Sequence, residues 1–322
     1  MRLLLLPGAV LLIALINTPL PAAAEPASIQ QICQISGQPC LDALEPKLAS
    51  TPKGSLPWYE LTLYKLDSLF ELQKDQELFA LTSQLVADKQ LTEKGPAHFR
   101  ARLYIYLAKL LYARKNTQAS AYFLQQATTL LADLHQADFN PFTMVLLLNV
   151  QMYTTGNDEQ GYAALKALEQ QYRKSKDPVF LYELYNNLGH YSHRLNLLHE
   201  SVAYRQKALK AISGFKQQAR IAEAHYNLAR SLANIGQWRD TLPHLQQAEQ
   251  LYLTQGYSLL HNLAILHQAE ALWRSAQQAE ARIQFSRVQK KLVPDYAQAH
   301  LQRIQQLLAA PPDTASPDKK PN

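Results

Sequence analysis

Several features that are common in enzymes are scarce or missing in this sequence. Its 322 residues include two cysteines, Cys33 and Cys40. None of the motifs GxSxG, GxGxxG, GxxxxGKS/T or HExxH occurs, which excludes the usual signatures of nucleophile elbows, dinucleotide sites, phosphate loops and zinc proteases. No segment alternates apolar and polar residues for long, so strands are not expected. The sequence therefore predicts an all-α protein and offers little support for a catalytic site.

Clusters of charge of one sign are also missing. Lys and Arg total 32 against 26 Asp and Glu, and the formal net charge is +6. The basic residues are scattered along the chain and form no block of five or more. Such a distribution does not produce the basic face of a nucleic-acid-binding domain, so we expect no nucleic acid partner.

Long apolar runs are missing except at the N-terminus. Arg2 precedes an apolar run from Leu3 to Ile16, and Ala22 to Ala24 precede Glu25. This order is typical of a secretory signal peptide at 1–24, with cleavage expected after Ala24. The run is shorter than the roughly 20 residues that span a membrane, which disfavours the alternative of a retained anchor. We expect a periplasmic or secreted protein with no integral membrane span in the mature chain.

The two cysteines follow this segment and lie seven residues apart. In an oxidising compartment Cys33 and Cys40 are expected to form a disulfide, which for a loop of this size stabilises a fold by roughly 2–3 kcal/mol. Two free thiols, or a zinc site that would need two further ligands, are the alternatives. The bond would lie in an N-terminal segment at residues 25–56.

What the sequence does contain is a repeat. The surroundings of Leu228 recur at steps of 40 or 41 residues, with equivalent positions at Leu66, Leu107, Leu148, Leu188 and Gln268. Small residues recur at a second offset, where two helices would approach closely: Ser120, Gly161, Ser201, Thr241 and Ala281. Gly156, Asn196 and Gly236 follow the first helix of their units, where a left-handed residue ends a helix. The pattern predicts about six helix hairpins.

Prolines mark several helix boundaries. The dipeptides Asn140-Pro141 and Asp177-Pro178 each place an N-cap residue before a proline at the first helical position. Pro243 falls inside the second helix of its unit. That helix either starts late, capped by Asp240, or kinks at the proline.

Three stretches carry a family resemblance: NNLGHYSHRLNLLHESVAYRQKAL (186–209), YNLARSLANIGQWRDTLPHLQQAEQLY (226–252) and HQAEALWRSAQQAEARIQFSRV (267–288). They resemble the tetratricopeptide repeat (TPR) family, in an extended-helix variety because the family's usual period is about 34 residues. The resemblance covers about 57–293 and implies a right-handed superhelical solenoid of antiparallel hairpins. A capping helix at 294–310 and a disordered tail at 311–322 are expected to follow. Arg205 and Ala276 depart from the family pattern, which has a large apolar residue and a loop glycine there.

In this family the first helix of each hairpin lines the concave side, where extended peptides bind. The resemblance therefore implies a groove formed by Asn187, His190, Arg194, Asn227, Arg230 and Asn234. Related concave positions are Arg102, Lys109, Tyr153, Glu183, Glu223, Glu270, Trp273 and Arg274. Asparagine offers a donor and an acceptor to a ligand backbone, and arginine binds carboxylates in a two-pronged manner. A solvated concave surface without a particular ligand is the alternative.

The leading hypothesis is a non-catalytic scaffold or adaptor in the periplasm that binds an unidentified protein or peptide and needs no cofactor. A cell-envelope assembly factor acting as an oligomeric scaffold is the second hypothesis. A metal-binding protein or enzyme using His190 and His193 is the third. These two histidines share a helix face, but no carboxylate lies one turn away and His199 follows a helix break. The tyrosines of the first half suggest a further alternative, an aromatic site for sugar chains.

Overall fold

The computed structural model describes residues 28–33, 37–137, 141–154, 157–215 and 218–309, and within them it contains helices and no strand. The predicted signal peptide and tail, and the residues Asn140 and Gly156, lie outside the described residues. The helices are α1 (Ile29–Cys33), α2 (Gly37–Ser50), α3 (Leu56–Glu71), α4 (Asp75–Ala87), α5 (Lys89–Lys94), α6 (Ala97–Ala113), α7 (Thr117–Ala137), α8 (Pro141–Thr154), α9 (Asp158–Gln171), α10 (Pro178–Arg194), α11 (Leu198–Ile212), α12 (Gln218–Asn234), α13 (Trp238–Thr254), α14 (Ser258–Arg274), α15 (Gln278–Ser286), the 3₁₀ helix η1 (Lys290–Leu292) and α16 (Asp295–Ala309).

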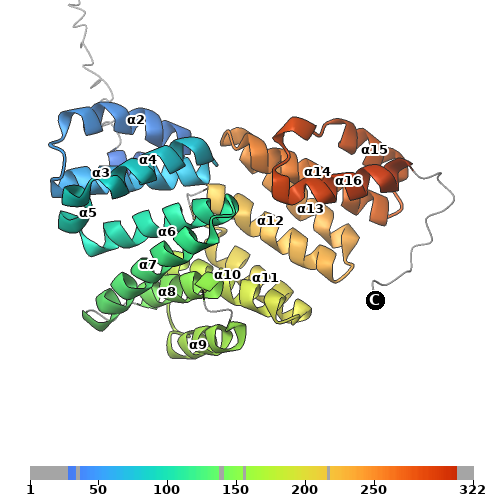
Figure 1. Ribbon diagram of the computed structural model, residues 1–322. Helices are drawn as coiled ribbons and strands as arrows, with labels where there is room; N and C mark the ends of the chain where they lie inside the picture. Colours follow the sequence, from blue (N-terminus) through green and yellow to red (C-terminus); the bar gives the residue numbers. More distant parts are fainter. Residues whose placement is uncertain (1–27, 34–36, 138–140, 155–156, 216–217, 310–322) are drawn as a thin grey trace, which may run out of the picture.

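Consecutive helices pack as pairs along a curved array, as Figure 1 shows. The pairs are α3/α4, α6/α7, α8/α9, α10/α11, α12/α13 and α14/α15, and α16 packs against both helices of the last pair. The equivalent positions Leu107, Leu148, Leu188, Leu228 and Gln268 are all buried between helices. The predicted all-α solenoid of about six hairpins with a capping helix is confirmed. The short helix α5, inserted between the first two pairs, was not predicted.

The predicted small residues lie where the helices of a pair touch. Ser120 Oγ donates to the carbonyl of Ala108 at 2.9 Å, and Ser201 Oγ donates to the carbonyl of Gly189 at 2.9 Å. In each case a hydroxyl of the second helix binds a carbonyl of the first helix, twelve residues earlier. A serine at this offset thus serves two purposes. Its small side chain lets the two helices approach closely, and its buried hydroxyl has a hydrogen-bonding partner.

Gly161 meets the same requirement in a different way. A Cβ atom built on Gly161 would lie 2.4 Å from the ring of Tyr191, which belongs to the next pair. The Tyr191 hydroxyl passes through this space and donates to the carbonyl of Leu148 at 2.7 Å. A side chain from the neighbouring repeat therefore supplies a buried hydrogen bond near the one that serine supplies elsewhere, to the carbonyl one residue earlier.

The turns between paired helices use left-handed backbone, as the sequence predicts for two of them. Asn196 has φ 58° and Gly236 has φ 77°. Lys115 and Ala276, at the equivalent positions of other units, also have positive φ values of 62° and 63°. The turn geometry is therefore retained even where the residue has a Cβ atom, at a cost in backbone strain.

The proline positions agree with the sequence in one case and correct it in another. The Asp177 carboxylate accepts hydrogen bonds from the backbone N–H groups of Val179 and Phe180 at 2.9 and 3.2 Å, so the predicted N-cap is confirmed. Helix α13 begins at Trp238 and runs through Pro243. Of the two alternatives for Pro243, the late start capped by Asp240 is wrong, because packing against α12 and α14 holds the first turn of α13 in place despite the proline.

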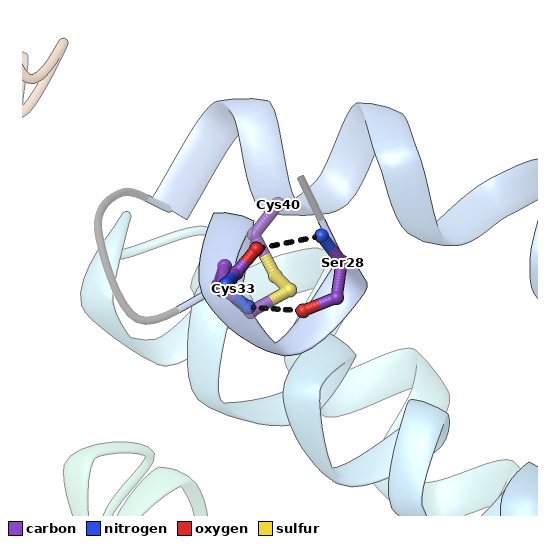
Figure 2. The surroundings of a disulfide bond; sticks show 4 residues. Ser28, Cys33 and Cys40 are labelled. Carbon is purple, nitrogen blue, oxygen red and sulfur yellow. Dashed lines mark hydrogen bonds between the residues drawn. A yellow bond between two sulfur atoms is a disulfide. The ribbon is translucent and has the colours of Figure 1, made fainter. Parts of the chain in front are cut away.

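The predicted disulfide joins the first two helices. Cys33, at the end of α1, is bonded to Cys40 in α2, with the two Cα atoms 4.6 Å apart (Figure 2). Gly37, between them, has no room for a side chain, because a Cβ atom there would lie 2.8 Å from Leu72 Cγ. The disulfide therefore fixes the segment that covers the end of α3. Among the described helices, none has both the length and the apolar composition that crossing a bilayer requires.

Candidate functional site

The concave side of the array forms a partly open cavity of about 440 Å³, which we call the central cavity. It is formed chiefly by the first helices of five successive pairs, which is the arrangement that the TPR resemblance implies. The lining residues are Cys33, Tyr64, Asp67, Ser68, Phe70, Glu71, Arg102, Ile105, Tyr106, Lys109, Val145, Leu146, Asn149, Glu183, Asn186, Asn187, His190, Arg220 and Glu223.

Helices far apart in sequence meet across this cavity. The carboxyl group of Glu71, on α3, is close enough to Arg220 and Glu223, on α12, for both charges to act on it. Leu72, directly after α3, packs against the N-terminal core and also against the C-terminal core. The buried side chain of Tyr257, before α14, interacts with Glu71 as well. The curvature of the solenoid thus brings its two halves into contact and closes one side of the cavity.

Both signs of charge line the cavity, and part of this charge is paired. Arg102 Nη2 donates to Asp67 Oδ1 at 2.8 Å, and the Tyr106 hydroxyl donates to the same oxygen at 2.6 Å. Arg220 forms an ion pair with Glu183 from the neighbouring pair of helices. These contacts link successive repeats while they hold charged groups at the cavity wall.

Burial shifts the titration of three other lining groups. It raises the pKa of Glu71 to about 7, with the negative charges of Asp67 and Glu223 acting in the same direction. It lowers the pKa of Lys109, although Glu183 and Glu223 oppose this effect. Burial also holds the pKa of His190 well below its usual value, and nearby cations act in the same direction. His190 is therefore neutral near pH 7.

Asparagine side chains connect the repeats along the cavity. The Asn149 amide donates to Asn187 Oδ1, and Asn187 Nδ2 donates to the carbonyl of Glu183 at 2.8 Å. Asn186 Oδ1 accepts from the buried guanidinium of Arg205, the residue that departs from the family pattern. Each amide has two N–H groups and an oxygen with two lone pairs, so these bonds leave capacity for a ligand.

Of the groove residues predicted from the sequence, Asn187 and His190 line the central cavity. Asn227 lies beside it, where its amide donates to Asn186 Oδ1 and to Glu223 Oε1, both at 3.4 Å. Arg194 does not reach it. Its Nε instead donates to both carboxylate oxygens of Asp158 at 2.8 Å, near the end of α10.

The other two predicted residues also lie away from the cavity. Arg230 is exposed, and its guanidinium lies over the Tyr226 ring, 5.9 Å from the centroid. Asn234 is exposed at the end of α12, and its Nδ2 lies 3.4 Å from His193 Nδ1. The concave face is therefore divided into an enclosed half around Asn187 and a more open half around Asn234.

The concave positions of the last pair are covered. Glu270 and Trp273 are buried, at 5% and 6% exposure, and Glu270 pairs with His300 and Arg303 of α16. The capping helix thus occupies the place that a following repeat would take. Glu270 and Trp273 are therefore buried and do not line the central cavity.

Two alternatives from the sequence rested on residue type, a metal site at His190 and His193 and an aromatic site for sugar chains. Among the described residues, no third His, Cys, Asp or Glu converges on His190 and His193 to complete a set of three metal ligands. Tyr64 and Tyr106 line the central cavity, whereas Tyr112 and Tyr122 are exposed elsewhere.

Sequence reasoning missed the contribution of α3 and of Arg220. Asp67 and Glu71 fall in the unit where the repeat pattern is weakest, so no equivalent concave position was assigned to them. Asn149 carried a usable signal, since it directly follows the repeat position at Leu148.

No family model matches the sequence, and the search of curated proteins finds no match. Solved structures do share the fold. A Rap protein complexed with Competence and Sporulation Factor has a TM-score of 0.54 and 14% identity, with 84% of this chain and 81% of that chain covered. A STAND protein with a tetratricopeptide repeat sensor, from Pyrococcus horikoshii, has a TM-score of 0.50 and 13% identity, with 85% of this chain covered. The match spans 42% of that longer protein. The chain is therefore a TPR-like helical solenoid.

Proposed function

We propose that this protein is a non-catalytic scaffold or adaptor that binds a peptide or an extended protein segment in the central cavity. The observation that carries the proposal is the cavity itself, in which amides and charges of both signs face one enclosed space on the concave side. The similarity in fold to a Rap protein that was solved in a complex supports it. Repeat arrays commonly bind extended partners along such a surface.

The lining predicts the chemistry of the ligand. Asn149 and Asn187 can bind backbone N–H and C=O groups, which every peptide offers. Lys109 and Arg220 favour a carboxylate, whereas Glu71 and Glu223 favour an amine or a guanidinium. A short segment with charges of both signs therefore fits better than a purely apolar or a purely acidic one. The volume of about 440 Å³ limits the enclosed part to a few residues.

We further propose that the protein acts in the periplasm. The signal-like start of the sequence supports this, and so does the disulfide between Cys33 and Cys40, since such bonds persist in oxidising compartments. Cell fractionation and N-terminal sequencing of the mature protein test it. A chain that begins at Glu25 in the periplasmic fraction is expected. A cytoplasmic chain that retains Met1 would contradict the proposal.

Site-specific photo-crosslinking in the cell tests the binding function. A photoreactive amino acid at Asn187 lies in the central cavity, whereas one at Tyr122 lies on α7, where the side chain is 60% exposed outside the cavity. A crosslinked peptide or protein is expected at Asn187 and not at Tyr122.

Two results would count against the proposal. The first is an identical set of products at both positions, and the second is the absence of any product at Asn187 in a correctly folded variant. Mass in solution separates the binding module from the alternative of an oligomeric assembly scaffold. A monomer is expected, and a stable homo-oligomer that gives only self-crosslinks would favour the assembly factor.

A further inference from the structure

A second cluster of chemically versatile side chains lies away from the central cavity, under the capping helix. His267 and Glu270 belong to α14, and His300 belongs to α16. One potential ligand atom from each of the three lies within 4.8 Å of the other two. Among the described residues, this is the one group of three potential metal ligands whose ligand atoms lie this close together. Their spacing in the sequence does not connect them, because His300 lies 30 residues after Glu270.

The fold explains why these three groups meet. Residues three apart on a helix share a face, so His267 and Glu270 point to the same side of α14. Helix α16 packs on this side and adds His300. Glu270 is 5% exposed, the His300 side chain is 18% exposed, and the Tyr226 ring packs edge-on against His267 with the centroids 5.5 Å apart. The cluster is therefore positioned by buried packing and not by loops.

His300 and Glu270 form a close, largely buried pair. His300 Nε2 lies 2.9 Å from Glu270 Oε2, and the two side chains are 18% and 6% exposed. An imidazole nitrogen and a carboxylate oxygen are both atom types that Zn²⁺ binds.

Two cations compete for the same carboxylate. Arg303 Nη2 lies 3.1 Å from Glu270 Oε1, and Arg274 Nε lies 4.0 Å from it. The side chains of Arg303 and Arg274 are 57% and 41% exposed, so both can turn into solvent. A metal ion would displace Arg303 from Glu270, which makes removal of this arginine an informative variant.

We propose that His267, Glu270 and His300 bind a divalent transition metal ion, with Zn²⁺ as the best match. Two imidazoles and one carboxylate form a donor set that Zn²⁺ accepts, with a fourth position left for water. Ligand atoms around tetrahedral Zn²⁺ lie about 3.3 Å apart, so small side-chain rotations from the present spacing suffice. The bound ion joins α16 to α14 and so fastens the cap of the solenoid.

The test uses the full mature chain purified without an affinity tag. Equilibrium dialysis against ZnCl₂, followed by elemental analysis, is expected to give one Zn²⁺ per chain, and Zn²⁺ is expected to raise the melting temperature. His267→Ala and Glu270→Gln are expected to weaken binding by at least about tenfold, since even loss of an outer-shell partner costs that much. His300→Gln is a third ligand variant for use if another fails to fold.

Two further variants make the result specific. His225 and His244 also contact each other, with their Nδ1 atoms 2.9 Å apart, and the double variant His225→Ala, His244→Ala is expected to leave Zn²⁺ binding unchanged. Arg303→Ala is expected to tighten binding, because it removes the competing cation. A folded protein that binds no Zn²⁺, or that loses it equally in the control double variant, would overturn the proposal.

Discussion

Buried polar groups at single positions set how closely neighbouring helices approach. Ser120 and Ser201 each bind a carbonyl across a helix pair, and the Tyr191 hydroxyl does so from the adjacent repeat. The helix already provides a partner for each of these carbonyls, but a buried hydroxyl without a partner would cost about 1–3 kcal/mol, so these bonds constrain which residues can stand at each offset. Gly161 is glycine because the Tyr191 ring already occupies the space of its side chain.

The substitution Gly161→Ala tests this explanation. Its Cβ atom would lie 2.4 Å from the Tyr191 ring, so we expect a loss of about 1–3 kcal/mol in the free energy of unfolding. Urea denaturation followed by circular dichroism measures the change. Gly214→Ala is the matched control, because nothing lies within 4 Å of the added Cβ atom. Equal stabilities of the two variants would contradict the proposed contact.

At the scale of helices, the array depends on how each pair turns. The first helix of each of five pairs is followed by a residue with positive φ, namely Gln73, Lys115, Asn196, Gly236 and Ala276, and only Gly236 is a glycine. Ala276 and Lys115 adopt the same conformation at a cost of roughly 1–2 kcal/mol relative to an unstrained residue. The packing of the helices on either side holds these turns in the left-handed conformation. A sequence rule based on glycine alone therefore finds one of these five turns and misses the other four.

The strain at Ala276 can be relieved. Ala276→Gly is expected to raise the free energy of unfolding by about 0.5–1 kcal/mol, because the relief exceeds the extra entropy that glycine adds to the unfolded chain. Gly236→Ala is the reciprocal variant and is expected to lower stability by a similar amount. Thermal and urea denaturation of both variants give the answer. A loss of stability in Ala276→Gly would show that the turn is not strained.

At the scale of the whole molecule, the contact between its two halves is the feature that makes a cavity out of a curved surface. Leu72 packs into both the N-terminal and the C-terminal cores, and Glu71 beside it faces charges from α12. The disulfide holds α1 and α2 against this junction through Gly37.

Closure is expected to depend on pH through Glu71. Its pKa is about 7 in the folded protein against 4.5 for the ordinary carboxyl, so the folded state binds more protons between these values. Stability contributed by this group is therefore present below pH 4.5 and is lost as the pH rises through 7. Glu71→Gln is expected to remove this dependence of stability on pH. The stability of the variant relative to the unsubstituted protein is therefore expected to be higher at pH 8 than at pH 5.

Melting temperatures at pH 5 and pH 8 measure the effect. The control is Glu159→Gln, an exposed glutamate of α9 that lies outside the central cavity, and it is expected to keep the original pH dependence. If Glu71→Gln and the unsubstituted protein show the same slope, Glu71 does not carry the raised pKa. The charged groups that act on Glu71, and to which the slope would then be assigned, are Asp67, Arg102, Arg220 and Glu223.

The sequence by itself specified the local structure of this protein. Leu188, Leu228 and their equivalents determine the helix pairs, because each repeat packs only against its neighbours and its apolar pattern reports that packing directly. The same holds for the N-cap at Asp177 and for the disulfide, whose partners are near in the chain. Part of the central cavity was also within reach, since Asn187, His190, Arg102, Lys109, Glu183 and Glu223 lie on first helices that the repeat identifies.

The contacts between distant helices required the three-dimensional arrangement. Glu71 meets Glu223, and Leu72 meets the C-terminal core, because a small rotation at every repeat accumulates into a full curve. No single repeat encodes that sum. Arg194 and Asn234 have the repeat offsets of groove residues. They nevertheless lie outside the central cavity, because the accumulated curvature decides which part of the concave side it occupies. His300 joins His267 only because the capping helix folds back on α14, a long-range packing choice that local periodicity does not record.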